Sequence, residues 1–456
     1  MLPDSYRTTP ARLAIRSFLL HGASLIAIAT LLERGFLFLA NVLSARIAGA
    51  ENYGAYGLAL QTAGFLASQA SLGIGMVATR FAAEYPVGHP QNQAFVLRII
   101  HLSVQLALIA SLLMLICVWP LAHWFYNKPL FFRVLLVTVF TAPMFVMLDA
   151  ARGLMLGLSY YRGLVMLSSI FGITMLLLMP WAAMEGPGWM VFAHAVSALS
   201  ACTVILWLLH HHFNVNLFSR IASDVPVKPM LRFGLLQLGT STAVNLVMIA
   251  MMALLVRYAS REELMATSLL PLGFALQQGV VWMANYALSV YPFFGFREVG
   301  YYNAASSIRN ITGVLPSLLN QATISLMTRL RGEPYGGVNR VVLINTWLSA
   351  IYMIPVTCVG LILLPWLLPF FFGKDFVEGV YPASYLLVVA LIHMISQPAV
   401  NQLTILRPRV IMFIHMAWIV VALLSAWFLV PGQGAAGVAL ALILAHSVAA
   451  ILVPLA

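Results

Sequence analysis

Long apolar runs dominate this sequence and leave it few folds to adopt. Thirteen segments are mostly apolar over about 20 residues or more, so each can cross a hydrocarbon core about 30 Å thick. Lipid offers the backbone no hydrogen-bond partner, and runs of this length must therefore be helical. Hydrophobic residues make up 62% of the chain and charged residues 8%, which excludes a soluble domain. The segments are roughly 18–45, 54–80, 96–118, 131–151, 161–183, 188–209, 231–256, 265–291, 300–328, 341–368, 380–403, 410–430 and 435–455.

One stretch of the sequence occurs twice. Gly49–Tyr85 opens on a Gly/Tyr-rich motif, ENYGAYG, which predicts a turn before an apolar run that closes with TRFAAEY. Phe296–Tyr335 repeats this order, from FREVGYYNAA to TRLRGEPY. The repeat predicts two homologous halves. Corresponding pairs are Gly54 and Gly300, Tyr56 and Tyr302, Ala59 and Ala305, and Lys128 and Lys374, at a spacing of 246 residues, and Thr79 and Thr328, at 249.

One apolar segment, Leu231–Val256, lies between the halves and has no counterpart in either. Cytoplasmic loops of membrane proteins are enriched in Lys and Arg. If the segment does not cross, 17 of the 24 Lys and Arg residues are cytoplasmic and five lie outside; if it crosses, the split is 12 to 10. We therefore expect twelve crossings and cytoplasmic termini. The expected domains are a six-helix bundle over 1–212, a linker over 213–263 with a re-entrant or interfacial helix (231–256), and a second six-helix bundle over 264–456.

Charged side chains inside apolar spans are the main functional signal, since a central Arg or Asp costs about 2.5–3.5 kcal/mol to insert. Glu33 and Arg34 lie near the middle of the first span, about 100° apart around the helix, so they do not simply neutralise each other. Arg34 shares a helix face with Thr30 and Asn41. Two readings stay open. The residues form ion pairs with a neighbouring span, or they face a lumen, where Arg34 binds substrate and Glu33 couples an ion.

The second half carries a matching charge, Arg309, on a polar face of the span 300–328. The span 265–291 has a polar face of its own. Together these faces predict a hydrated cavity between the halves with a cationic wall. An arginine there can bind a diphosphate through its planar fork of donors, which suits an anionic lipid head better than a drug cation. The predicted substrate-binding residues are Arg34, Arg309, Asn41, Asn285, Asn303 and Asn310.

Further charged residues lie at or near span ends. Asp149 and Arg152 are three residues apart and can pair on one helix face, as an anchor or, for Asp149, as an ion-coupling site. Arg80 and Glu84 lie four residues apart at the end of the first repeated stretch, and Arg329 takes the place of Arg80 in the second. A gate latch and an interfacial anchor are both consistent with this spacing.

Other residue types give no sign of metal or catalytic chemistry. The span histidines, among them His393 and His446, read as single residues that each hydrogen-bond a neighbour. Three widely separated cysteines indicate neither a disulfide framework nor a metal site. The formal charge of +11 is spread between apolar runs, so no nucleic-acid partner is expected. We expect no catalytic residue, no metal and no cofactor.

The repeated motifs resemble those of a known family. The turn GAENYGAY with TRFAAEY behind it, the repeat EVGYYNAA with LPSLLNQ, and the later FGKDF and GAAGVALA are similar to the polysaccharide-flippase branch of the multidrug/oligosaccharidyl-lipid/polysaccharide transporter superfamily. The likeness covers most of the chain and is weakest over Phe213–Glu263. It implies an all-α polytopic membrane protein of about twelve transmembrane helices, with two homologous six-helix bundles in a MATE-like V.

This resemblance implies a flippase and not an enzyme. Its expected substrate is a polyprenyl-diphosphate-linked oligosaccharide, moved by alternating access from the cytoplasmic to the outer leaflet of the bacterial inner membrane for O-antigen, capsule or exopolysaccharide synthesis. Expected partners are membrane lipids and polysaccharide polymerase or assembly proteins. The alternatives are a cation-coupled multidrug exporter of the same fold, a flippase of another lipid-linked precursor, and a membrane glycosyltransferase or polymerase. An exporter of cations should have an acidic cavity, and a transferase should have catalytic acids.

Overall fold

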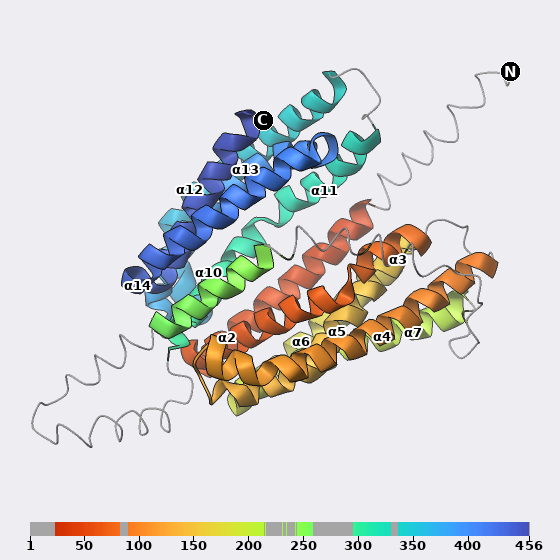
Figure 1. Cartoon of the computed structure of the whole chain (residues 1–456), viewed down its shortest axis with the longest axis horizontal. Coiled ribbons are helices and arrows are strands. Elements are labelled where there is room, and N and C mark those ends of the chain that lie inside the picture. The colour runs from red at the N-terminus through yellow and green to blue at the C-terminus, as the bar shows by residue number, and fades with distance from the viewer. Residues whose placement is uncertain are drawn as a thin grey trace, which may run out of the picture.

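The protein is built of helices gathered into two lobes (Figure 1). The computed structural model describes residues 23–82, 90–213, 215, 230, 234, 242, 244–258, 295–329 and 336–455, and no strand occurs among them. The N-terminal lobe holds α2 (Ala23–Ser71), α3 (Ile74–Ala82), α4 (Pro90–Pro120), the π-helical turn η3 (Leu121–Phe125), α5 (Phe131–Gly157), α6 (Tyr161–Glu185) and α7 (Pro187–Phe213). The C-terminal lobe holds α10 (Arg297–Thr312), α11 (Val314–Arg329), α12 (Gly336–Phe372), the 3-10 turn η5 (Lys374–Gly379), α13 (Val380–Leu406) and α14 (Pro408–Leu455).

Two of the helices, α2 and α14, are each two spans joined at one glycine (Figure 1). They hold 49 and 48 residues, or about 70 Å of helix, which is more than twice a hydrocarbon core of about 30 Å. Gly49 (φ 74°) and Gly434 (φ 53°) interrupt them with left-handed backbone, which glycine adopts without steric cost. The predicted turn over ENYGAYG was wrong: Gly49 alone makes the reversal, and the motif itself is helical.

The number of spans agrees with the predicted fold class. Eight described helices are long and apolar enough to cross a membrane. Since α2 and α14 each provide two spans, these helices are long enough for ten crossings, and α10 with α11 covers the predicted span 300–328. The predicted span 265–291 lies outside the described residues, as do most of the predicted linker and its boundaries, so the domain limits stay a prediction.

The two repeated spans are broken where the sequence predicted continuous helices. In the first half the break falls at Leu72 (φ 48°) and Gly73 (φ 65°), between α2 and α3. In the second it falls at Gly313, between α10 and α11. At the first break a side chain, Asp149, accepts from the backbone N–H of Gly75, whereas Gly313 keeps helical hydrogen bonds to Arg309 and from Ser317.

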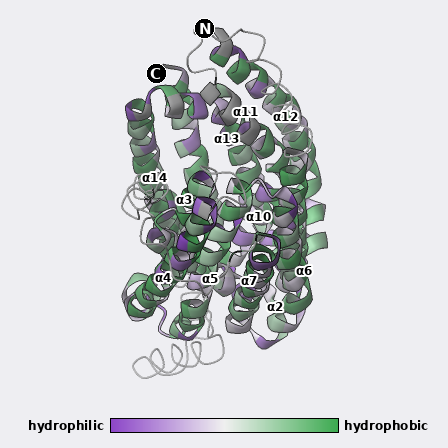
Figure 2. Cartoon of the chain, turned by 90° about the vertical axis from the view of Figure 1, so that its right-hand side faces the viewer, coloured by the Kyte–Doolittle hydropathy of each residue, from purple (hydrophilic) through white to green (hydrophobic). Residues whose placement is uncertain are grey.

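The outer surfaces of both lobes are apolar. Figure 2 shows hydrophobic residues along most of the helices. Large side chains there are open, with Leu177 72% and Phe428 77% exposed, whereas alanines dominate the helix contacts inside the lobes. This arrangement suits a lipid-exposed surface around closely packed helices, where small residues let backbones approach.

The described part of the segment 231–256 lies lengthwise along the N-terminal lobe. A Cβ on Gly234 would lie 1.9 Å from the Leu72 carbonyl oxygen, near the end of α2. At the far end of the adjoining helix Val244–Tyr258, Arg257 donates to the carbonyl oxygen of Trp124 in η3. These contacts favour a lengthwise course over an interfacial one. Whether the segment crosses the membrane stays a prediction, because 231–233 and 235–241 lie outside the described residues.

Candidate functional site

A cavity of about 340 Å³ lies between the two lobes, at the level of Arg34. Helices from both halves of the chain contribute to it, so a ligand bound there would contact both lobes. The volume is at the lower end of the range for small-molecule sites. Its lining includes Arg34 from α2, Val244 and Met248 from the helix Val244–Tyr258, Arg309 and Asn310 from α10, His393 from α13, and Trp418 and His446 from α14.

The two span arginines meet at one residue, Asn310. Arg34 donates from Nη1 to the Asn310 carbonyl oxygen at 3.4 Å, and Arg309 donates from Nη2 to the Asn310 side-chain oxygen at 3.4 Å. Both hydrogen bonds are long, and both guanidinium groups keep further donors for another partner. Asn310 lies in the last turn of α10, directly before the helix break at Gly313.

The charge of this cavity is positive. Arg34 and Arg309 line it, and none of the described lining residues is acidic. Two guanidinium groups that line one cavity favour a ligand with several anionic oxygens, such as a phosphate or diphosphate. The arrangement supplies binding and orientation for such a ligand.

Glu33 is directed into the N-terminal lobe, away from this cavity. Its Oε1 accepts from Arg152 Nη2, and its Oε2 accepts from Ser168 Oγ at 3.0 Å. The expected pairing of Arg152 with Asp149 on one helix face was therefore wrong, because a carboxylate on another helix takes the guanidinium. Because Glu33 is engaged by Arg152, the charge of Arg34 is left for the cavity.

We expect Glu33→Gln to lower the free energy of unfolding by about 2 kcal/mol, between the values for exposed and buried pairs. The two side chains are 20% and 34% exposed, so water partly screens the Arg152 charge that the substitution leaves behind. The double variant Glu33→Gln, Arg152→Met should recover most of the loss. Thermal melting in detergent would measure both, and equal midpoints for Glu33→Gln and wild type would contradict the expectation.

Asp149 binds a backbone N–H group at the break between α2 and α3. Its Oδ2 accepts from the backbone N–H of Gly75 at 3.1 Å, in the first turn of α3. A Cβ on Gly75 would lie 2.4 Å from this carboxylate, so the glycine lets the acid approach the helix end. This is the geometry of a helix cap. Asp149 does not line the cavity, and its role in ion coupling stays a prediction.

At one end of the molecule the lobes are in close backbone contact. A Cβ on Gly54 would lie 2.0 Å from the Phe296 carbonyl oxygen, and a Cβ on Gly300 would lie 2.1 Å from the Ala50 carbonyl oxygen. Gly54 and Gly300 are equivalent positions of the repeat, and so are Ala50 and Phe296. The two contacts are thus reciprocal, and we call them the glycine crossing. It joins α2 to α10 beside Gly49 (Figure 1).

Charged residues surround the glycine crossing. Glu51 and Arg297, a further equivalent pair, line a cavity of about 310 Å³ together with Asp375 of η5. The charges of Glu51 and Arg297 act on each other across the lobes. Opposite charges at this end favour the contact between the lobes.

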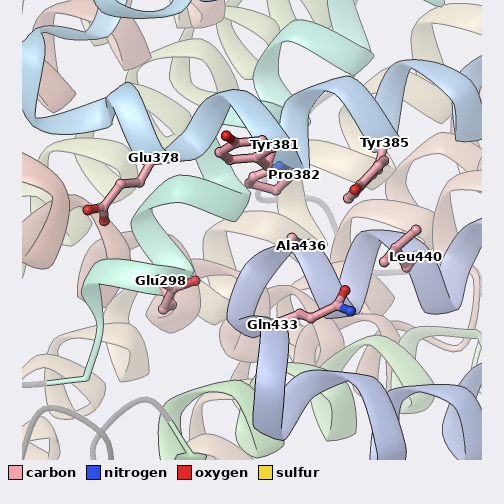
Figure 3. A pocket seen from close by; sticks show the side chains of 8 residues that line it. All are labelled: Glu298, Glu378, Tyr381, Pro382, Tyr385, Gln433, Ala436 and Leu440. Carbon is pink, nitrogen blue, oxygen red and sulfur yellow. The ribbon is translucent and has the colours of Figure 1, made fainter.

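A third cavity, of about 360 Å³, lies within the C-terminal lobe at the same end (Figure 3). Glu298 and Glu378 line it with Tyr381. Glu298 accepts from the backbone N–H of Ala435 at 2.7 Å, and Glu378 accepts from the hydroxyl of Tyr301 at 2.9 Å. The first contact fixes the start of the second half of α14, so this cavity is explained by helix capping.

The other predicted site residues do not gather at the Arg34 cavity. Asn303 lies in the lobe contact, where its Nδ2 would be 2.0 Å from a Cβ on Gly57. Asn41 is half-buried on α2 and does not line the cavity. Arg80 lies over the ring of Phe81 at 5.5 Å. Asn285, Glu84 and the side chain of Arg329 lie outside the described residues.

Sequence reasoning missed three lining residues, Trp418, His393 and His446. The histidines were read as separate residues, but their ring centroids lie 5.0 Å apart. They come from α13 and α14, more than 50 residues apart in sequence. The sequence marked His393 and His446 only by their position inside apolar spans. Other histidines of the chain share that position, so it did not single these two out.

Comparison with known proteins finds a matching family and a known fold. A family model described as "Polysaccharide biosynthesis protein" matches residues 19–331. A comparison with curated protein sequences finds no match. The fold is similar to an inward-facing MATE-family multidrug resistance transporter of the MOP superfamily (TM-score 0.67, 16% identity, 92% of each chain covered) and to the lipid II flippase MurJ in an inward closed conformation (TM-score 0.70, 13% identity, 94% of this chain and 86% of that one).

A third solved structure shares the fold. It is a MOP-superfamily transporter from Pyrococcus furiosus, described as having a binding pocket of reversed polarity that suggests a different function (TM-score 0.56, 16% identity, 95% and 94% covered). At such identities these likenesses show the fold alone. They confirm the MATE-like fold that the sequence motifs implied, and they show that MurJ is similar to it as well.

Proposed function

The chain belongs to the polysaccharide biosynthesis protein family, a group of multi-pass MOP-superfamily transporters and flippases, and from this we propose its cargo and direction. It moves polyprenyl-diphosphate-linked oligosaccharide from the cytoplasmic to the outer leaflet of the bacterial inner membrane. The polysaccharide polymerase or assembly proteins then take up the oligosaccharide. The polyprenyl tail stays in lipid while the polar head passes through the protein.

The observation that carries this proposal is the pair of arginines, Arg34 and Arg309, on the two sides of one cavity without a described acidic residue. The diphosphate is the part of the substrate that such a pair would bind. A multidrug exporter of cations would place positive cargo beside two positive side chains, so we disfavour it. Another lipid-linked diphosphate precursor would fit the pair equally well, and the transport assay below compares the two.

The lobe contacts support the proposed direction. The lobes touch at the glycine crossing, whereas Arg309 lies about 14 Å beyond Gly300 along α10. If the end that carries Gly49 faces outward, this conformation is closed outside and accepts substrate from the cytoplasm. Rocking of the lobes would then expose the cavity on the other side. An inside-negative potential favours outward movement of an anionic head by about 2.3 kcal/mol per charge per 100 mV.

Reconstitution into liposomes tests the proposal. We expect the protein to accelerate leaflet exchange of a labelled polyprenyl-diphosphate oligosaccharide, and an imposed inside-negative potential to increase outward exchange. A polyprenyl-diphosphate carrying a peptidoglycan precursor serves as the competing substrate, and an organic drug cation as the control cargo. Exchange no faster than in protein-free liposomes, together with uptake of the cation, would refute the proposal.

A further inference from the structure

The Arg34 cavity is lined by hydrocarbon as well as by charge. Its two arginines come from α2 and α10, but six of its lining residues are aliphatic or methionine: Val244, Met248, Val389, Ala390, Met394 and Leu442. The first two come from the helix Val244–Tyr258, whose described contribution to the lining is wholly apolar. A ligand that fills this cavity therefore meets charged donors on one part of its surface and hydrocarbon on another.

Three of the apolar side chains present open surface. Val244, Met248 and Met394 are partly exposed, whereas the other three are 2% exposed. Val244 and Met248 lie one turn apart and share a helix face. Leu246 lies about 200° away from Val244 around the same helix and is 52% exposed. The helix thus turns one apolar face to the cavity and another to the surface of the molecule.

The apolar lining adjoins the arginines. Met394 of α13 has its Cε 3.0 Å from the position that a Cβ on Gly313 would take, at the end of α10 that carries Asn310. Asn310 accepts hydrogen bonds from both Arg34 and Arg309. One ligand can therefore contact the two guanidinium groups and Met394 together.

The proposed substrate is amphipathic at its diphosphate. The diphosphate joins the first isoprene unit of the lipid to the first sugar, so one of these two groups must lie beside the phosphates against the cavity wall. The cavity volume of about 340 Å³ is at the lower end of the range for small-molecule sites. It is too small to enclose an oligosaccharide in addition to the diphosphate.

The apolar lining distinguishes between the sugar and the isoprene unit. Sugar hydroxyls placed against Val244 and Met248 would lose water without gaining a hydrogen-bond partner. An isoprene unit has no polar atom, and its transfer from water to an apolar surface is favourable. Methionine side chains are flexible, so Met248 and Met394 can adapt to a branched, unsaturated chain.

We infer that the apolar lining of the Arg34 cavity binds the first isoprene unit of the lipid while Arg34 and Arg309 bind the diphosphate. The ligand class of this cavity is thus a prenyl diphosphate, and the sugars extend beyond it. This inference rests on the proposed function and deepens it, since the first unit of the tail enters the protein and the remainder stays in lipid. Val244, Met248 and Met394 are specificity residues in this account.

Ligands of equal charge test the inference. Methyl diphosphate and the diphosphate ester of a single isoprene unit carry the same anionic group and differ by four carbons. Wild-type protein in detergent should bind the prenyl ester at least about tenfold more tightly, even with only half of the added surface buried. A hexosyl diphosphate should bind no more tightly than methyl diphosphate. Equal affinity for the methyl and prenyl esters, or a gain with the hexosyl ester alone, would overturn the inference.

A double variant, Val244→Thr, Met248→Gln, keeps the shape of the wall and makes it polar. It should reduce the preference for the prenyl ester to about twofold and leave the affinity for methyl diphosphate unchanged, which also shows that the variant is folded. Leu246→Gln is the matched control, since Leu246 lies on the same helix and does not line the cavity. It should keep the preference of the wild type. The same preference in the double variant would contradict the inference.

A second measurement uses the wild-type protein alone. A prenyl diphosphate that carries a diazirine on its isoprene unit should label Val244, Met248 or Met394, and excess methyl diphosphate should suppress this labelling. Labelling of Leu246 without such suppression would place the chain on the exposed surface and overturn the inference.

The affinities also separate the two proposals. Binding of methyl diphosphate that requires Arg34 and Arg309, without any gain from the prenyl group, would refute the inference and leave the proposed function standing. If wild-type protein binds none of these diphosphates, both are refuted.

Discussion

Replacing Arg34 and Arg309 together with alanine is expected to slow leaflet exchange of the lipid-linked oligosaccharide by about a hundredfold. Each guanidinium supplies charge-assisted hydrogen bonds, worth about 1.5–3 kcal/mol apiece, to an anionic head. Even the lower value for both gives about 3 kcal/mol, and each 1.4 kcal/mol is a factor of ten. The measurement is exchange in liposomes, or surface polysaccharide in cells that depend on this protein.

Matched variants separate binding from charge. Arg133→Ala removes an exposed arginine of α5 that does not line the cavity, and its exchange rate should equal that of the wild type. The double lysine variant at positions 34 and 309 keeps both charges and loses the planar fork, so its rate should fall between those of the wild type and the double alanine variant. Unchanged exchange in the double alanine variant, at equal protein level, would count against the cavity as the binding site.

The second large effect is expected from Gly300→Ala at the glycine crossing. The new Cβ would lie 2.1 Å from the Ala50 carbonyl oxygen, and backbone atoms on both sides prevent local relief. The lobes would have to separate by more than 1 Å at this end, so the closed state seen here would be lost and exchange should fall at least about tenfold. Folding should persist, since the contact joins lobes and does not lie within either.

Cross-linking would measure this separation. In a variant without Cys117, Cys202 and Cys358, the substitutions Glu51→Cys and Arg297→Cys place thiols on the two sides of the crossing. A short bismaleimide should join them, and Gly300→Ala should suppress the product. Gly64→Ala is the control, because its Cβ would meet nothing within 4 Å. Equal cross-linking in both glycine variants would mean that the crossing tolerates a methyl group.

The sequence was most informative about the positions of the helices and least informative about which side chains pair between helices. Apolar run length predicted the spans, and spacing along single helices placed Arg34 and Arg309 on inward faces; the structure brings both into one cavity. The partner of Glu33 could not be found this way, since Arg152 lies on another helix and local spacing favoured Asp149. Periodicity identifies a helix face but does not identify the helix that packs on it.

Glycine positions were misread for a related reason. ENYGAYG has the composition of a loop, yet Gly54 lies inside the helix α2. A glycine is needed there because the backbone of Phe296 and Gly300 approaches too closely for a side chain. The glycine in this motif allows α2 and α10 to approach closely, at positions 246 residues apart in the sequence. Composition alone does not distinguish such a contact from a turn. His393, His446 and Trp418 were missed because their association arises only when α13 packs on α14.

The glycine crossing also bears on how the two repeats diverged. In a symmetric dimer of one ancestral repeat, the positions of Glu51 and Arg297 would hold the same residue on both subunits, and equal charges facing the shared space would repel. Fusion of the genes frees each copy to mutate alone. An acid and a base can then face each other across the glycine crossing. A homodimer has the same residue at equivalent positions on its axis, so it cannot form this attraction there.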